Sequence, residues 1–241
     1  MQHRQTPVVG WEGVKAVIFD VDGTLYDQSK LRKKMLFDLL SYYAKHPWRY
    51  KELSMLSEFR NERENRAGFG CPDLDNAQYT WCAEKRGYPV HKLKSIVQQW
   101  IFQRPIRYLA GCVYPGASEL FKVLRQNNIR IAIYSDYPAH DKLMAMGLTA
   151  DLLVSSTDPE INQLKPDPKG LLYAVDQLGL SAAECLFIGD RQEMDGECAL
   201  RAGVPYLIID KKPYSQFDFY SKLIDDITSK TQQYETQRIA F

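Results

Sequence analysis

Two aspartates, Asp20 and Asp22, flank a single valine and are followed directly by Gly23. An ionised carboxylate can attack an electrophile, exchange a proton or bind a cation. Two carboxylates this close repel each other unless a cation lies between them, and no lysine or arginine adjoins them in the sequence. The pair therefore indicates chemistry that depends on a metal ion.

The Asp-x-Asp-Gly run has other interpretations. A calcium-binding loop would have Gly at its sixth position and Glu at its twelfth, where this chain has Leu25 and Leu31. An Asp-x-Asp pair after a strand also occurs in metal-dependent glycosyltransferases, and two aspartates can simply belong to a polar turn. The run alone leaves these last two interpretations open.

Hydroxyl, ammonium and further carboxylate groups follow later, each after an apolar run or a polar loop. They are Ser135 with Asp136, Lys165, and Asp190 with Asp195. Taken singly, each has an ordinary explanation, such as a helix cap, a surface lysine or an acidic turn. Their joint occurrence favours one active site assembled from several segments.

Short apolar runs rich in β-branched and aromatic residues predict the strands that position these groups. The runs lie at 15–19, 129–134, 152–155, 185–188 and 204–209, and helices are predicted at 117–126, 142–146, 169–178 and 217–227. Gly23 lets the chain turn after the first strand, so that both aspartates project from its carboxyl end. In open α/β sheets, this is the edge where ligands bind.

The segment from Asp27 to about Cys112 is much longer than an ordinary connection between strands. Apolar residues at helical spacing predict helices in it at 31–44, 53–66, 75–86 and 90–100. The segment is therefore predicted to be a helical insertion of the bundle type.

Three arginines of this insertion, Arg60, Arg63 and Arg66, share one predicted helix and are candidates for binding a second anionic group of a substrate. Glutamates are interleaved with them along the helix. This pattern favours a solvated, ion-paired helix face over a binding site.

The chain of 241 residues is 45% hydrophobic and has a formal net charge of +1. This near balance gives no reason to expect nucleic acid or an anionic membrane as a partner. Its five cysteines include no Cys-x-x-Cys pair and are interpreted as reduced thiols. The first residues lack the apolar core of a signal peptide, and no apolar run approaches the ~18 residues of a membrane span. A cytoplasmic protein is expected.

The polar groups together resemble the four motifs of the haloacid dehalogenase (HAD) superfamily. The first motif matches 20–25, the second Ser135, the third Lys165 with Pro166, and the fourth Gly189 and Asp190 through Asp195. The resemblance implies an α/β fold with a Rossmann-like, three-layer core around a central parallel sheet. An insertion directly after the first motif implies a small α-helical C1-type cap, as in phosphoglycolate phosphatases and their relatives. The implied domains are a core of residues 1–26 and 113–241 and a cap of residues 27–112.

The resemblance also implies roles for the motif residues. Asp20 would be the nucleophile that forms an aspartyl-phosphate, and Asp22 would act first as general acid and then as general base. The phosphate would be bound by Gly23, Thr24, Ser135, Asp136 and Lys165. A magnesium ion would be held by Asp20, the backbone carbonyl of Asp22 and Asp190, with Asp195 binding the ion directly or orienting its waters.

Asp22 favours one reaction within the superfamily. Members that resemble dehalogenases or phosphonate hydrolases generally lack this second aspartate, so transfer of phosphate from an oxygen is favoured. The expected protein is a magnesium-dependent phosphatase for a small phosphorylated metabolite, monomeric or weakly dimeric, with no nucleic acid or membrane partner. A sugar phosphomutase would keep the same motifs, and a non-catalytic binding protein is a further alternative.

The chain departs from the usual family motifs at two places. The second motif has Ser135 where threonine is also common, and the loop at 158–164 lacks the glycine often found before the motif lysine.

Overall fold

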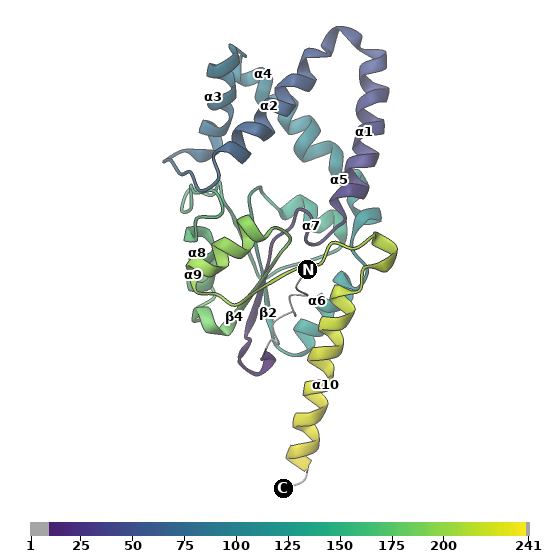
Figure 1. Ribbon diagram of the computed structural model, residues 1–241, viewed down its shortest axis with the longest axis vertical. Coiled ribbons are helices and arrows are strands. Elements are labelled where there is room, and N and C mark those ends of the chain that lie inside the picture. Colours follow the sequence, from purple (N-terminus) through teal and green to yellow (C-terminus); the bar gives the residue numbers. More distant parts are fainter. Residues whose placement is uncertain (1–9, 240–241) are drawn as a thin grey trace, which may run out of the picture.

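The computed structural model of the protein describes residues 10–239. Within this range, parallel strands form a central sheet in the order β3-β2-β1-β4-β5 (Figure 1). The strands are β1 (Ala16–Phe19), β2 (Arg130–Ser135), β3 (Leu152–Ser155), β4 (Cys185–Gly189) and β5 (Tyr206–Ile208). Every residue of β1 is buried, as expected for the middle strand of a sheet that is covered on both faces.

Alternate residues of β1 face two different hydrophobic cores. Val17 and Phe19 pack on the side of α6 (Ala117–Gln126), α7 (His140–Met146) and α10 (Phe219–Ile239). Ala16 and Ile18 pack on the side of α8 (Lys169–Gln177) and α9 (Glu197–Ala202). Because successive strand side chains point to opposite faces, the sheet is the middle of three layers. The predicted Rossmann-like α/β fold is confirmed.

A helical insertion, defined here as residues 28–112, lies between β1 and α6. It contains α1 (Gln28–Lys45), α2 (Lys51–Asn65), α3 (Leu74–Arg86), α4 (Val90–Val97), a π-helical stretch (Gln98–Gln103) and α5 (Arg104–Leu109). Figure 1 shows it as a separate layer of helices beyond the sheet. The chain enters and leaves it at one place, since Tyr26 and Val113 form an antiparallel bridge and the backbone N–H of Asp27 donates to the Cys112 carbonyl at 2.9 Å.

The predicted strands and helices are present, with ends that differ by a few residues. The helix predicted at 90–100 ends at Val97 as an α-helix and continues as the π-helical stretch. The helix predicted at 217–227 extends further, to Ile239. No helix among the described residues is both long enough and apolar enough to cross a membrane.

Candidate active site

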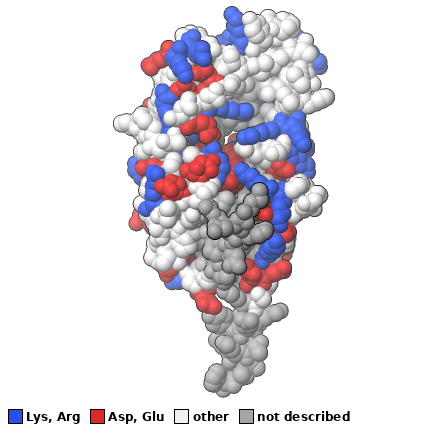
Figure 2. Space-filling model, viewed as in Figure 1, with Lys and Arg blue, Asp and Glu red and all other residues white. Residues whose placement is uncertain are grey.

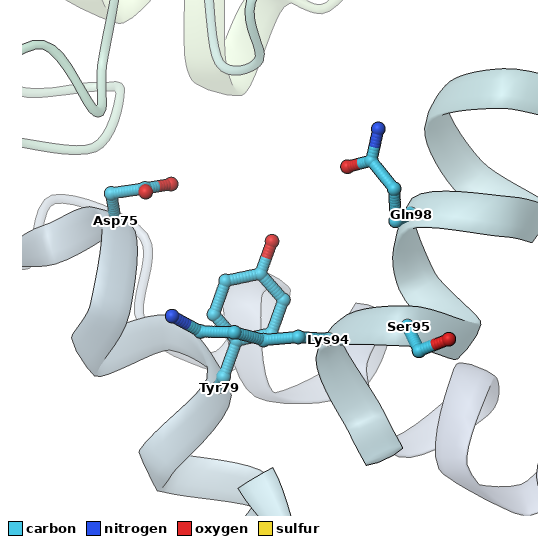
Figure 3. Close-up of a pocket in the computed structure, with 5 residues that line it drawn as sticks. All are labelled: Asp75, Tyr79, Lys94, Ser95 and Gln98. Atoms are coloured by element: carbon cyan, nitrogen blue, oxygen red, sulfur yellow. The ribbon is translucent and has the colours of Figure 1, made fainter. Parts of the chain in front are cut away.

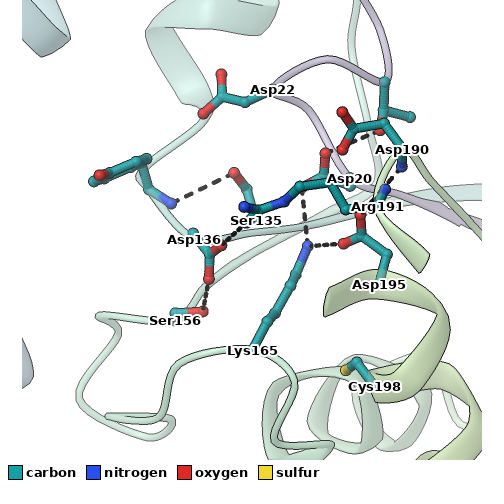
Figure 4. Close-up of polar contacts among 12 residues, drawn as sticks. Asp20, Asp22, Ser135, Asp136, Ser156, Lys165, Asp190, Arg191, Asp195 and Cys198 are labelled. Carbon is teal, nitrogen blue, oxygen red and sulfur yellow. Dashed lines mark hydrogen bonds and ion pairs between the residues drawn. The ribbon is translucent and has the colours of Figure 1, made fainter. Parts of the chain in front are cut away.

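The predicted motif residues meet at the carboxyl ends of three adjacent strands (Figure 4). Asp20 follows β1, Ser135 ends β2, and Asp190 follows β4. Gly23 has φ +94°, and a Cβ atom at this position would lie 2.3 Å from Oδ2 of Asp190. Glycine is therefore required for the loop after β1 to approach the loop after β4.

Three carboxylates form a buried cluster at this edge. Asp20, Asp190 and Asp195 each offer an oxygen, and these atoms lie within 4.8 Å of one another. Lys165, which is 1% exposed, places Nζ 2.9 Å from Oδ1 of Asp20 and 2.8 Å from Oδ1 of Asp195. Figure 4 shows the lysine side chain rising between these two aspartates. Lys165 is thus a shared cationic partner for two of the three acids.

The second carboxylate oxygens of Asp20 and Asp195 also have partners. Oδ2 of Asp20 accepts a hydrogen bond from the Thr24 hydroxyl at 2.9 Å. Oδ2 of Asp195 accepts the backbone N–H groups of Asp190 and Arg191, both at 3.1 Å. The fully buried Thr24 therefore orients the Asp20 carboxylate from behind, and its side chain is not part of a ligand surface.

With all three acids ionised, the cluster would carry more negative charge than Lys165 offsets. Burial raises the pKa of Asp20 to about 8; Lys165 opposes this rise, while Asp195, Asp190 and Asp22 add to it. Burial lowers the pKa of Lys165, but Asp195 and Asp20 outweigh it, so its pKa lies well above the ordinary value and the lysine stays charged. Closely spaced carboxylate oxygens with excess negative charge suit a hard divalent cation. The residues present therefore fit a metal of the magnesium type.

Asp22 belongs to a separate ion pair. Nζ of Lys142 lies 2.6 Å from both carboxylate oxygens of Asp22, and the Tyr26 hydroxyl donates to Oδ1 at 2.5 Å. Burial raises the pKa of Asp22, but Lys142 and Tyr26 outweigh it and the pKa is lowered. Lys142 was not predicted as a site residue. Locally it is only a lysine on a short helix beside the apolar residues Leu143 and Met146, and this pattern does not point to Asp22.

Replacing this lysine is expected to destabilise the protein in a pH-dependent way. Lys142→Met should lower the free energy of unfolding at pH 7 by about 2 kcal/mol, because Asp22 loses a buried, charged hydrogen-bond partner. The pKa of Asp22 is lower in the folded protein, so the ion pair stabilises above the unfolded pKa of ~3.9 and its contribution disappears as the pH falls through the folded value. Urea titrations from pH 8 to pH 3 should show a constant loss down to about pH 5 and a smaller one below pH 4. A loss that does not shrink in acid would contradict this assignment.

The cluster and the Lys142 pair open into a cavity of about 810 Å³ between the core and the helical insertion. Asp20, Asp22, Ser135, Asp136 and Lys165 line it, whereas Gly23 and Thr24 do not. The Ser135 hydroxyl accepts the backbone N–H of Tyr137 at 3.4 Å, so its proton can still be donated into the cavity. The Asp136 carboxylate instead accepts the Ser156 hydroxyl at 3.0 Å.

The predicted ion-paired face of α2 is only partly present. Arg66 pairs with Glu62, as expected. Arg63 is buried: it donates to the Gln78 amide and to the backbone carbonyl of Asp136, the latter at 2.8 Å. The ion-paired interpretation is therefore wrong for Arg63, which joins the insertion to the loop after β2. Arg60 is exposed and lines the cavity.

A loop of the insertion also pairs with the loop that carries Lys165. The backbone N–H of Gly68 donates to the Lys165 carbonyl and that of Leu164 to the Phe69 carbonyl, both at 2.9 Å. The side chain of Asn162 accepts the N–H of Leu74 at 3.0 Å and donates to the Pro72 carbonyl at 3.0 Å. We call this set of contacts the loop pair. It attaches the insertion directly to the backbone that positions the motif lysine.

A second, smaller hollow of about 340 Å³ lies on the insertion (Figure 3). It is lined by Asp75, Tyr79, Lys94, Ser95 and Gln98. None of the motif residues reaches it, and the Lys94 ammonium group is 5.2 Å from the centre of the Tyr79 ring. The larger cavity is therefore the candidate active site.

The fold and the site define a class of protein: a Rossmann-like α/β protein with aspartates and a lysine at the carboxyl edge of its sheet. The chain matches the family model of haloacid dehalogenase-like hydrolases over residues 14–203, and it belongs to this family. A phosphoglycolate phosphatase from Rhodospirillum rubrum is 34% identical over 105 residues, covering 42% of this chain and 43% of that protein. The match thus spans less than half the length of this curated relative.

Solved structures show the same fold. A HAD phosphatase from Thermococcus onnurineus gives a TM-score of 0.55 at 23% identity, covering 85% of this chain and 92% of that one. A β-phosphoglucomutase from Clostridium difficile gives a TM-score of 0.55 at 16% identity, covering 90% and 99%. At these identities the likeness concerns the fold alone.

Proposed function

We propose that the protein is a magnesium-dependent phosphatase that hydrolyses a small phosphorylated metabolite through an aspartyl-phosphate on Asp20. The observation that carries this proposal is the cluster of three aspartates around Lys165, on a cavity that Asp22 also lines. Asp20 shares Lys165 with Asp195, whereas Asp22 is bound to Lys142 and Tyr26. The curated relative named a phosphoglycolate phosphatase supports the same reaction class.

The proposed chemistry assigns one task to each side chain. Asp20 attacks phosphorus in its ionised form, which a cation bound beside the acids would favour by offsetting the repulsion that raises its pKa. This attack splits the hydrolysis into two easier steps. Asp22 lines the same cavity. Lys142 and Tyr26 favour its ionised form, which suits it to remove a proton from the water that attacks the aspartyl-phosphate; to protonate the leaving oxygen in the first step, it must take up a proton when the substrate binds. Ser135 donates to a phosphate oxygen, and Lys165 offsets negative charge.

The metal site would use Asp20, Asp190 and the backbone carbonyl of Asp22, with Asp195 as a direct ligand or as a partner of bound water. When bound, the ion neutralises charge so that the anionic phosphate and the anionic nucleophile can approach each other. Lys211, whose Nζ lies 2.7 Å from Oδ2 of Asp190, would then compete with the ion for that oxygen.

The helical insertion would act as a cap over the cavity. This proposal is supported by the cavity lining, which combines core motif residues with side chains from α1 and α2. It is also supported by the contacts of Arg63 and of the loop pair with the core. A cap that excludes bulk water protects the aspartyl-phosphate from adventitious reactions and selects small substrates.

The decisive experiment measures inorganic phosphate released from a panel of phosphate monoesters, with magnesium, in water enriched in oxygen-18. A phosphatase is expected to release phosphate that contains one oxygen from the solvent. Movement of phosphate between hydroxyl groups of a sugar without such release would instead identify a phosphomutase. Binding of the esters without either reaction would overturn the enzymatic proposal.

A further inference from the structure

The cavity changes character with distance from the catalytic cluster. Near the core its lining is charged: Arg63 and Glu64, at the end of α2, reach Asp136 and Arg191 of the core. Basic and acidic side chains gather around this junction on the face drawn in Figure 2. Farther along α2, and on α1, the lining is mostly apolar. It includes Met35, Leu36, Leu39, Leu53 and Leu56, beside the hydroxyl group of Ser57.

The length of α2 separates the two zones clearly. Leu53 precedes Arg63 along this helix, and at 1.5 Å per residue it lies about 15 Å from Arg63 along the helix axis. On α1, Met35 and Leu39 are one helical turn apart and line the same cavity. The apolar zone is therefore continuous with the catalytic cluster but extends well beyond the reach of a phosphate group.

Part of the apolar zone is open to solvent. Leu36 is 56% exposed and Leu53 is 42% exposed, although both line a cavity that also contains the catalytic side chains. Covering such surface with an apolar ligand group is favourable, whereas hydroxyl groups of a sugar would lose water here without gaining partners. A cavity of about 810 Å³ also matches the volume range of drug-sized ligands and far exceeds that of a two-carbon acid.

Two further arginines stand at the core end. Arg32 and Arg60 line the cavity, and their charges act on the phenol groups of Tyr26 and Tyr137. They add positive potential close to where the phosphate must lie. Among the described residues, the lining around Leu36 and Leu53, farther from the core, contains no charged side chain. The cavity thus has one anionic recognition zone and one apolar zone.

We propose that the substrate is a phosphate monoester with an elongated apolar group. This proposal rests on the proposed phosphatase function and specifies its substrate class. The phosphate meets Asp20 and Lys165, and the apolar group lies between α1 and α2 against Leu36 and Leu53.

The first test compares kcat/KM for n-alkyl phosphates from ethyl to octyl with that for phosphoglycolate and glucose 6-phosphate. Within the alkyl series, kcat/KM is expected to rise roughly two- to fourfold for each methylene that reaches the apolar walls. Leu36→Gln and Leu53→Gln should each lower kcat/KM for octyl phosphate about tenfold and that for ethyl phosphate much less. The matched control is Leu172→Gln: Leu172 is 44% exposed on α8, outside the cavity, and its replacement should change neither value.

The second test measures binding without turnover. Octylphosphonate should bind the wild-type protein with magnesium at least tenfold more tightly than methylphosphonate, and Leu53→Gln should reduce this difference. A flat alkyl series together with a preference for phosphoglycolate or glucose 6-phosphate would overturn the inference and leave the phosphatase standing. Tight octylphosphonate binding without release of phosphate from any ester, including p-nitrophenyl phosphate, would overturn the proposed function and retain the apolar site. Equal binding of both phosphonates would overturn the inference on its own.

Discussion

Asp20→Asn is expected to abolish turnover while making the metal-free protein more stable. The amide keeps the size of the side chain but removes the nucleophile, so kcat should fall by at least about 10³-fold. The pKa of Asp20 is raised to about 8 in the folded protein, so above an unfolded pKa of ~3.9 its ionised form opposes folding. The free energy of unfolding at pH 7 should therefore be higher for the variant than for the wild-type protein, by up to roughly 4 kcal/mol, and this gain should vanish below about pH 4.

Asp195→Asn is the matched control, because Asp195 shares Lys165 with Asp20 and has the opposite pKa shift. Burial raises the pKa of Asp195, but Lys165 and the two backbone N–H groups outweigh it, so the folded pKa is lowered. Its ionised form favours folding above pH ~3.9, and its replacement should destabilise the protein at pH 7. Urea titrations of both variants in EDTA, at pH 7 and pH 4, measure whether each substitution raises or lowers the free energy of unfolding. Near-normal turnover of Asp20→Asn would contradict the proposed mechanism. A change of stability in the same direction for both variants would contradict the opposite pKa shifts assigned to Asp20 and Asp195.

Removal of divalent metal is expected to reduce turnover to background. Asp20 and Asp190 cannot neutralise a phosphate dianion themselves, and Lys165 is already shared by two carboxylates. Dialysis against EDTA should stop phosphate release, and magnesium should restore it. Calcium should restore little, because its longer bonds and higher coordination number misplace the nucleophile.

A second readout of the metal does not depend on turnover. Magnesium should raise the melting temperature of the wild-type protein, because an ion that binds only the folded state stabilises it. Asp190→Asn should weaken this effect strongly, whereas Lys211→Met should strengthen it by releasing Oδ2 of Asp190. Full activity after exhaustive dialysis would contradict the proposed metal site.

The sequence predicted those parts of the site that local pattern determines. Asp20, Ser135 and Asp190 each adjoin an apolar strand, and parallel strands bring their carboxyl ends to one edge. Lys142 was missed because its partner Asp22 is far away in the chain, and only the packing of α7 beside the sheet brings the two together. Long-range pairs of this kind have no signal in local spacing.

The insertion was harder to predict for a related reason. Helical periodicity gave correct positions for α1 to α4, but it could not tell which face of α2 turns toward the core. Arg63 therefore seemed equivalent to Arg66, whereas the first bonds to Asp136 and the second to Glu62. The apolar cavity wall was likewise indistinguishable from a bundle core, since both need apolar residues at helical spacing.

The loop pair limits how freely the two parts of this molecule can be recombined. Residues 68–74 of the insertion share backbone and side-chain hydrogen bonds with residues 162–165, which follow far later in the chain. An insertion grafted from another protein would lose these partners unless the segment around Asn162 were transferred with it. Chimaeras that exchange both segments should keep Lys165 in register, and exchanges of the insertion alone should disturb the position of this lysine. Under the proposed function, a change of insertion made to alter substrate preference would therefore also affect the position of the motif lysine.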